Sequence, residues 1–190
     1  MSQFGWSTLV KVSMIAAGST TASALLAMGL AFGCPAALAQ PGDYGSLPVD
    51  PNVVTDSTAY VAGEPTLNPN GQPGVELVFT HRDSSRKITD TILVLSDPAA
   101  AAAALDGTTP EVVTSIPGGG RTSAPVGTGG TMITGASPDG KQSVTVVRFT
   151  EGGTATVIEF SGAAGDPVPP DLAVDYAKRQ DAALKDAGAV

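Results

Sequence analysis

The chain has 190 residues and a formal net charge of −8, with 10 Lys and Arg against 18 Asp and Glu. This length favours one domain, or two at most. The excess of acidic residues argues against a nucleic-acid-binding protein, which needs a basic surface to neutralise phosphates. One Cys and one His exclude an internal disulfide, a thiolate-clustered zinc site and any site that needs two imidazoles. We therefore predict no metal and no cofactor.

The first 39 residues predict an export signal. They contain one basic residue, Lys11, no acidic residue, and an apolar stretch over residues 12–32. An A-x-A pattern then ends at Ala39, which predicts cleavage between Ala39 and Gln40 and a secreted or cell-envelope protein. The apolar stretch is also close to membrane-spanning length, so a retained membrane anchor is the alternative.

Cys34 raises the question of a lipid anchor. Gly33 suits the position before a lipidated cysteine, but Ala31 stands where a lipobox has Leu, and Pro35 follows. Cleavage after Ala39 would remove this cysteine together with the signal. We expect contact with a membrane only through an uncleaved signal or through association with the envelope.

Residues 40–74 contain six prolines and five glycines. Proline removes backbone donors and glycine raises the entropic cost of ordering, so this composition predicts an extended or disordered linker. Within it, Val53–Val54 and Tyr60–Val61 are candidates for a short edge strand.

Residues 75–190 predict a single α+β domain. Apolar and polar residues alternate from Val75 to Arg82, and a second strand at Lys87–Leu95 follows a turn, which together indicate a hairpin. Asp97 and Pro98 then predict the start of a short Ala-rich helix that Gly107 ends.

The rest of the domain predicts a further strand, a long loop, three paired strands and a helix. The expected ranges are a strand at 111–116, a Gly-rich loop at 117–130, strands at 131–136, 142–150 and 154–161, and a helix at 171–187. Asp171 is the predicted cap of that last helix. Short turns between the three strands indicate an antiparallel meander. We expect a mostly antiparallel sheet of about five to six strands, with the Ala-rich helix and the C-terminal helix packed on it.

No motif in the sequence forms a complete catalytic site. Residues 81–83 read His-Arg-Asp, like the start of a kinase catalytic loop, but the rest of that motif is missing. Residues 135–142 approach a phosphate-binding loop, yet Gln142 replaces the required hydroxyl and begins a strand. A Ser-His-acid hydrolase would have to use His81, the one imidazole. We therefore predict that the protein is not an enzyme.

Two acidic residues, Asp90 and Glu159, interrupt otherwise apolar strands. We expect both to point to solvent, with Arg148 as the natural cross-strand partner of either.

The Gly-rich loop is the preferred functional surface, because a loop of this length on a small scaffold is usually functional or disordered. Its glycines would let the backbone of a partner approach closely, and plain flexibility is the alternative. The candidate partner-binding residues are Gly118, Gly119, Gly120, Arg121, Gly127, Gly129 and Gly130.

Several stretches resemble small exported proteins of mycobacteria and related actinomycetes, and this similarity would cover most of residues 70–190. These stretches are Val78–Asp83, Ile88–Leu95, Gly127–Gly130, Asp166–Pro170 and Lys178–Ala183. The order of elements is also similar to that of LpqN-type envelope lipoproteins, whose fold resembles the photosystem protein PsbP and Mog1. This resemblance implies a binding or assembly module and supplies no catalytic residues.

The sequence therefore predicts a secreted or envelope-associated, non-enzymatic binding protein whose partner, a protein or a lipid ligand, is unknown. The alternatives are a carrier of an apolar envelope lipid and a hydrolase that uses His81. An internal apolar cavity of a few hundred cubic ångströms would favour the carrier. A solid core with an exposed apolar patch would favour a protein-binding module.

Overall fold

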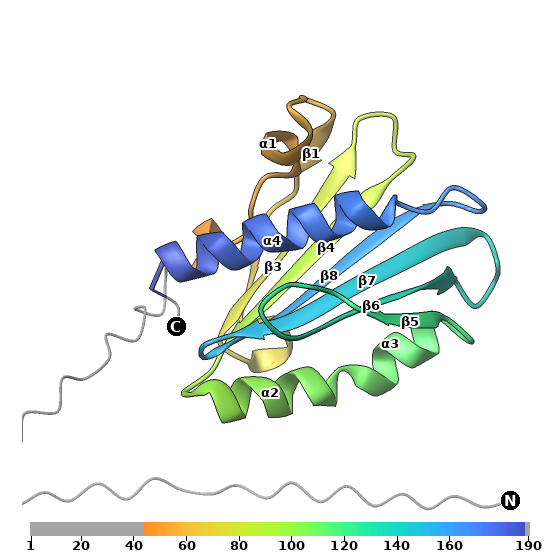
Figure 1. Cartoon of the computed structure of the whole chain (residues 1–190). Coiled ribbons are helices and arrows are strands. Elements are labelled where there is room, and N and C mark those ends of the chain that lie inside the picture. Colours follow the sequence, from red (N-terminus) through yellow and green to blue (C-terminus); the bar gives the residue numbers. More distant parts are fainter. Residues whose placement is uncertain (1–43, 189–190) are drawn as a thin grey trace, which may run out of the picture. The chain divides into compact units, whose positions relative to one another are not determined.

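The structure is a computed structural model, and it describes residues 44–188 (Figure 1). The predicted signal, Cys34 and the predicted cleavage site between Ala39 and Gln40 lie outside the described residues. No helix among the described residues is long and apolar enough to cross a membrane.

An antiparallel sheet of eight strands forms the centre of the fold, with the order β1-β3-β4-β8-β7-β6-β5 and β2 paired to β3. The strands are β1 (Tyr60–Ala62), β2 (Thr66–Leu67), β3 (Gly74–His81), β4 (Lys87–Val94), β5 (Gly120–Ser123), β6 (Thr128–Ala136), β7 (Gln142–Glu151) and β8 (Thr154–Ala163). The α+β class, the hairpin and the meander are confirmed. The expected number of five to six strands is wrong, because the short strands β2 and β5 lie in segments too rich in Gly and Pro to show a strand pattern.

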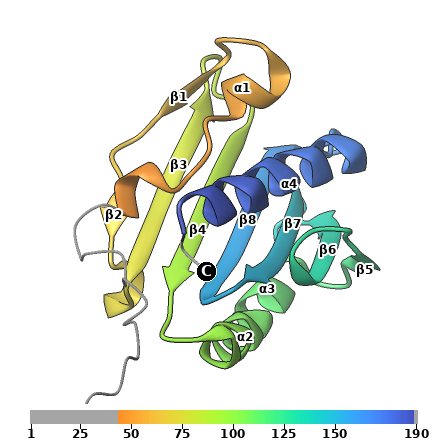
Figure 2. The same cartoon turned by 60° about the vertical axis from the view of Figure 1, so that its left-hand side comes forward.

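Helices lie on both faces of this sheet (Figures 1 and 2). The helices are η1 (Tyr44–Ser46), α1 (Pro51–Thr55), η2 (Pro69–Gly71), α2 (Pro98–Gly107), α3 (Thr109–Ser115) and α4 (Pro170–Asp186). Helix α4 covers one face and helices α2 and α3 cover the other. Each layer buries the apolar residues of alternate strand positions, as a period of two requires.

The start of α2 follows the predicted capping chemistry. The Asp97 side chain accepts a hydrogen bond from the backbone N–H of Ala100 at 2.8 Å, and Pro98 occupies the first turn. Helix α2 ends at Gly107, and after Thr108 the chain continues directly into a second helix, α3.

Helix α3 replaces the strand predicted at residues 111–116. Val112 and Ile116 are four residues apart, so both reach the same side of the helical turn and pack on Ile133, Val144 and Val146 of the sheet. This contact outweighs the preference of β-branched residues for strands, which is a weak local effect.

Helix α4 packs one face on the main hydrophobic core of the domain, which lies between this helix and the sheet. Ala173, Tyr176, Ala177 and Leu184 are buried there against strands β3, β4, β7 and β8. Tyr176 meets Phe160 of β8 in an edge-to-face arrangement with ring centroids 5.7 Å apart. The helix begins at Pro170 after a cap at Pro169 that makes no side-chain hydrogen bond, so the prediction of Asp171 as the cap is wrong.

Residues 44–62, here called the strap, are folded on the domain (Figure 2), in contrast to the predicted linker. Tyr44 and Leu47 are buried in the main core at 6% and 9% exposure. Gln180 of α4 accepts a hydrogen bond from Val49 N and donates one to Leu47 O, both at 2.8 Å. Beyond the strap, β2 pairs with β3 and Pro69 is buried, so the described part of residues 40–74 is integral to the fold. The edge strand expected near Tyr60–Val61 is present as β1, whereas Val53–Val54 lies in α1.

Candidate functional site

The predicted Gly-rich loop is largely an edge of the sheet. Strand β5 occupies Gly120–Ser123 and pairs with β6, which begins at Thr128. All four residues of β5 are exposed, Arg121 among them. The expectation of one long loop over residues 117–130 is therefore wrong, although the segment does lie at the surface.

Several glycines of this segment are explained by packing inside the domain. A Cβ on Gly119 would lie 2.7 Å from Cγ2 of Ile116, and one on Gly127 would lie 2.5 Å from the Phe149 ring. A Cβ on Gly130 would lie 2.3 Å from the carbonyl oxygen of Val126. These positions require glycine for contacts within the chain, without any partner.

The outer edge of β5 presents free backbone groups. Ala124 donates its N–H to Gly130 O at 3.0 Å, and bonded and non-bonded pairs alternate along an antiparallel ladder. Arg121 and Ser123 fall on the non-bonded positions of this register. Their N–H and C=O groups therefore point away from β6, on the side where the described sheet ends.

His81 ends β3 at the tip of the β3–β4 hairpin. Its Nδ1 lies 2.5 Å from Oδ1 of Asp83, and its ring meets the Tyr60 ring edge-to-face at 5.2 Å. Hydrogen bonds from Ser85, together with the one to His81, lower the pKa of Asp83 to about 2. Among the described residues, no serine or threonine hydroxyl is hydrogen-bonded to His81, so the pieces of a hydrolytic triad are not brought together there.

A polar depression lies beside this hairpin tip, and we call it the hairpin hollow. Its volume is about 210 Å³, and it is open to solvent. Its lining residues are Thr80, Ser84, Ser85, Arg86, Lys87, Gln142 and Ser161. Arg86 also donates from Nη2 to Asp166 Oδ2 at 2.5 Å, which ties the hairpin to the segment before α4.

The hollow between the sheet, α1 and α4 is too small for a lipid. It is lined by apolar side chains that include Val54, Ile88, Phe160 and Leu172, and its volume is about 30 Å³. A larger apolar depression of about 280 Å³ lies at the ends of β6 and β7, beside residues 164–167, but it is an open surface feature. Neither matches the internal cavity that a carrier of a large apolar molecule requires.

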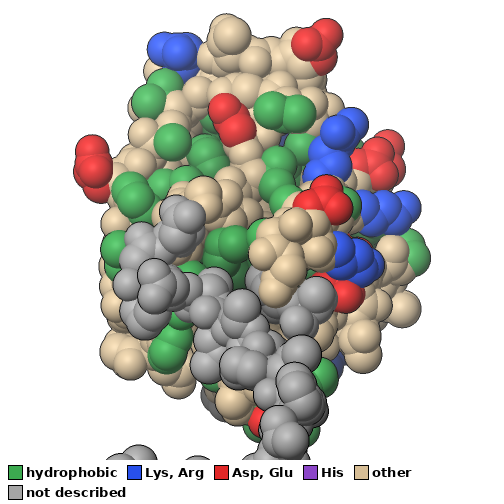
Figure 3. Space-filling view, turned by 90° about the vertical axis from the view of Figure 1, so that its left-hand side faces the viewer, with side chains coloured by type: hydrophobic (Ala, Val, Ile, Leu, Met, Phe, Trp, Pro, Cys, Tyr) green, Lys and Arg blue, Asp and Glu red, His purple; other side chains and the backbone are tan. Residues whose placement is uncertain are grey.

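Within residues 44–188, exposed large hydrophobic side chains are few and dispersed. Val53 and Val61 belong to the strap, Leu67 to β2 and Val113 to α3, with exposures between 47% and 64%. Figure 3 shows the side of the sheet with β3 and the strap, where hydrophobic side chains in the coloured area are interspersed with polar ones. No large continuous apolar patch stands out there as an interface.

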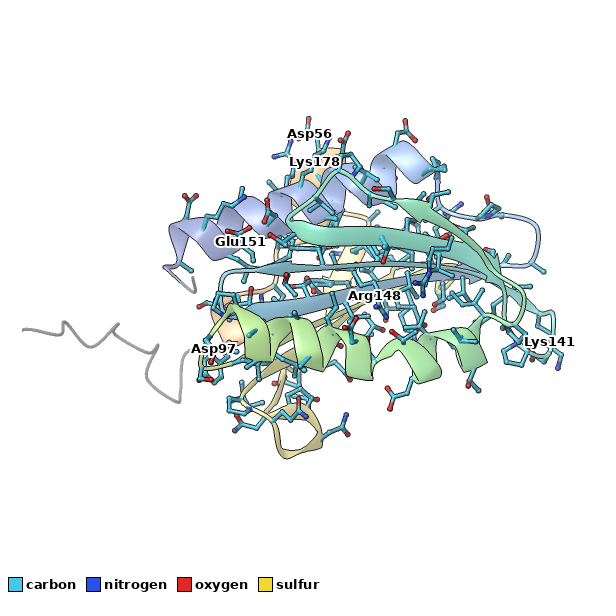
Figure 4. The ribbon with its side chains drawn as sticks, turned by 60° about the horizontal axis from the view of Figure 1, so that its bottom comes forward. Asp56, Asp97, Lys141, Arg148, Glu151 and Lys178 are labelled. Carbon is cyan, nitrogen blue, oxygen red and sulfur yellow. The ribbon has the colours of Figure 1, made fainter. Side chains whose placement is uncertain are left out.

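Asp90 and Arg148 are both buried, contrary to the expectation that Asp90 faces solvent and pairs with Arg148. Asp90 lies beneath α4, next to Tyr176 of that helix. Arg148 lies between β7 and the α2–α3 layer (Figure 4). Arg148 donates to Thr109 Oγ1 at 2.8 Å and lies 3.9 Å from Asp106. Burial lowers the pKa of this guanidinium, and the nearby charge of Arg121 acts in the same direction. Glu159 is half-buried and makes no ion pair within residues 44–188.

Groups of acidic, His or Cys side chains able to hold a metal ion do not occur among the residues that the structure describes. Two surface features are the candidates for binding, the exposed β5 edge and the hairpin hollow. Composition pointed to the region of β5, but nothing in the local sequence pointed to the hollow, which four separate segments build.

Comparisons with known proteins find a similar fold but no matching family. No protein-family model matches the sequence, and no curated protein matches it significantly. The extracellular domain of PknH from Mycobacterium tuberculosis is similar in structure, with a TM-score of 0.51 and 9% sequence identity over 73% of this chain and 93% of that chain. At this identity the likeness concerns the fold alone. The chain therefore shares its fold with the extracellular domain of a mycobacterial protein.

Proposed function

We propose that this protein is a secreted or envelope-associated domain that binds a protein partner and catalyses no reaction. The export-signal pattern of residues 1–39 supports a location outside the cytoplasm. The shared fold with an extracellular mycobacterial domain supports the same location. We also propose that the chain is related to the small exported actinomycete proteins that its sequence resembles and to the LpqN-type, PsbP-like proteins that its order of elements resembles.

The observation that carries the binding role is the exposed edge of β5. Natural proteins usually protect a sheet edge, since its free N–H and C=O groups can pair with another chain. The outward groups of Arg121 and Ser123 would accept an extended segment of a partner as an additional strand. The side chains of β5 contain no proline and no acidic group that would oppose such pairing.

Ser123→Pro tests this edge directly. Proline removes the outward N–H of residue 123 and leaves the β5–β6 hydrogen bonds in place, because that group takes no part in the ladder. Ser123→Ala is the matched control, since it keeps the N–H and removes only the hydroxyl. Full-length tagged chains should be expressed in the native host and isolated after mild crosslinking.

We expect one specific protein to be recovered with the unchanged chain and with Ser123→Ala, and to be lost with Ser123→Pro. Circular dichroism should show the same fold for both variants. Equal recovery with all three chains would contradict binding through the β5 edge.

A carrier of an apolar lipid is the second candidate, and the small size of the hollow under α1 and α4 argues against it. Native mass spectrometry of the protein purified from its own host distinguishes the two. A co-purifying lipid in stoichiometric amount would favour the carrier and overturn the protein-partner proposal.

A further inference from the structure

The strand register builds one wall of the hairpin hollow. Thr80 of β3 is opposite Lys87 of β4, and Lys87 is opposite Ser161 of β8. Residues in one such row point to the same face of the sheet. The next residues along the chain, Ile88 and Phe160, are in the core beneath α4. The row therefore faces away from α4, and Ser84, Ser85, Arg86 and Gln142 complete the hollow.

The lining of the hollow is rich in hydrogen-bond donors. It contains two cationic side chains, four hydroxyl groups and one amide, and it contains no carboxylate. The chain as a whole carries 18 acidic residues against 10 basic ones, so a pocket with cations and without acids departs from the general surface. Hydroxyl, ammonium and guanidinium groups together are the donors that bind oxyanions in proteins.

Two of these groups have no partner within residues 44–188. The Lys87 ammonium forms no ion pair there. Ser161 is only 8% exposed, and its hydroxyl forms no hydrogen bond in the described part of the chain. The residue lines the open hollow, so a ligand there can accept a hydrogen bond from this hydroxyl.

Arg86 adds a positioned but incompletely used cation. Its Nη2 donates to Asp166, which fixes the guanidinium at the rim, and that side chain is 30% exposed. A guanidinium has five N–H donors, and the described residues engage it through Nη2 only. Asp166 does not line the hollow, so the remaining donors of Arg86 are available to a ligand.

The turn holds the Asp83 carboxylate outside the hollow. The Asp83 carboxylate accepts hydrogen bonds from the backbone N–H of Ser85 at 2.8 Å and contacts His81. Ser84 adopts a positive φ of 62°, a conformation that is uncommon for a residue other than Gly and often marks a functional turn. Both serines of the turn thereby line the hollow, and the carboxylate does not.

We propose that the hairpin hollow binds a phosphate group, with Lys87 and Arg86 supplying charge and the Ser84 and Ser161 hydroxyls supplying hydrogen bonds. The volume of about 210 Å³ exceeds that of a single oxyanion, so a phosphate ester fits as well as inorganic phosphate. The site goes beyond the proposed protein partner, since none of its residues belongs to β5. It is open to water, so the attraction is screened and weakens as salt rises.

Two-dimensional NMR of the isotope-labelled, full-length gene product tests this site. Inorganic phosphate, glycerol 1-phosphate and vesicles of phosphatidylcholine with phosphatidylinositol are the three probes, each added at constant ionic strength. We expect saturable changes in the amide signals of residues 84–87 and 161–162. Saturation with inorganic phosphate assigns a free anion. A response to glycerol 1-phosphate and to the phosphatidylinositol vesicles, without a response to inorganic phosphate, assigns a phosphorylated headgroup.

Matched variants decide whether the hollow is responsible. Lys87→Gln should weaken binding about tenfold, and Ser161→Ala should weaken it several-fold, because each removes one donor. Lys178→Gln removes the same charge from the exposed side of α4 and should leave binding unchanged. The absence of saturable changes with all three probes, or equal weakening by Lys178→Gln and Lys87→Gln, would overturn the proposal.

Discussion

Asp90 is a buried carboxyl group whose environment makes the stability of the fold depend on pH. It is completely buried beneath α4, and its Oδ1 has no hydrogen-bond partner. Its Oδ2 lies 3.4 Å from the Tyr176 hydroxyl, which donates a shorter bond of 2.6 Å to Val49 O. Removal from water raises the pKa of Asp90 from 3.8 to about 7, and the hydrogen bond from Tyr176 offsets only part of that effect.

A raised pKa in the folded state means that the folded protein holds a proton that the unfolded chain releases above pH 4. The contribution of Asp90 to stability is therefore fully present below its unfolded pKa of about 3.9. It is lost as pH rises through about 7, the folded value. Above that pH, folding leaves a buried carboxylate with a single weak partner.

Asp90→Asn removes this pH-dependent contribution to stability and preserves the shape of the side chain. We expect the variant to gain stability relative to the unchanged protein between pH 5 and pH 8, by an amount on the order of a few kcal/mol. Urea unfolding of both proteins at each pH measures the difference. The same difference at pH 5 and pH 8 would show that Asp90 does not titrate between them.

Among the elements, the strap depends most on contacts with distant residues. Its backbone is held by Gln180 and Tyr176, which lie about one α-helical turn apart on the buried side of α4. Gln180 is fully buried and satisfies one backbone donor and one backbone acceptor of the strap. The N-terminal part of the domain is thus attached to its C-terminal helix.

Gln180→Ala should detach the strap from α4. Leaving Val49 N–H and Leu47 C=O without partners should cost about 2–4 kcal/mol of unfolding free energy. Limited proteolysis should then cleave residues 44–62 faster than in the unchanged chain. Arg179→Ala, on the exposed side of the same helix, is the control and should have little effect on either measurement. Unchanged protection of the strap in Gln180→Ala would contradict its attachment through this side chain.

Elements with strong local signals could be predicted from the sequence. The strands β3, β4, β7 and β8 show alternation or short turns, and α2 has Asp97 as a true cap. Helix α3 could not be predicted, because its β-branched residues favour a strand and only the sheet beneath it makes it a helix.

The strap and the hairpin hollow could not be predicted for a different reason. The strap is stabilised by Gln180, 131 residues from Val49 in sequence, and its prolines suggest a linker when considered alone. The hollow joins Ser84, Gln142 and Ser161, which come from separate strands and turns. Such sites depend on the register of the whole sheet, which local periodicity does not define.

The two proposed binding surfaces lie apart on the domain. Strand β5 ends the sheet on one side, while the hairpin hollow lies at the ends of β3, β4 and β8. Helical layers on both faces and a solid core leave no large internal cavity among the described residues. This arrangement suits a domain that presents its edge and its loops to other molecules outside the cell.

Native mass spectrometry of the chain isolated from the envelope and medium of its own host tests whether the protein leaves the cytoplasm and binds a protein partner. We expect a chain that begins at Gln40, without a lipid adduct, in a complex with a second protein. A chain found only in the cytoplasm with residues 1–39 attached, or one carrying a stoichiometric lipid, would contradict this proposal.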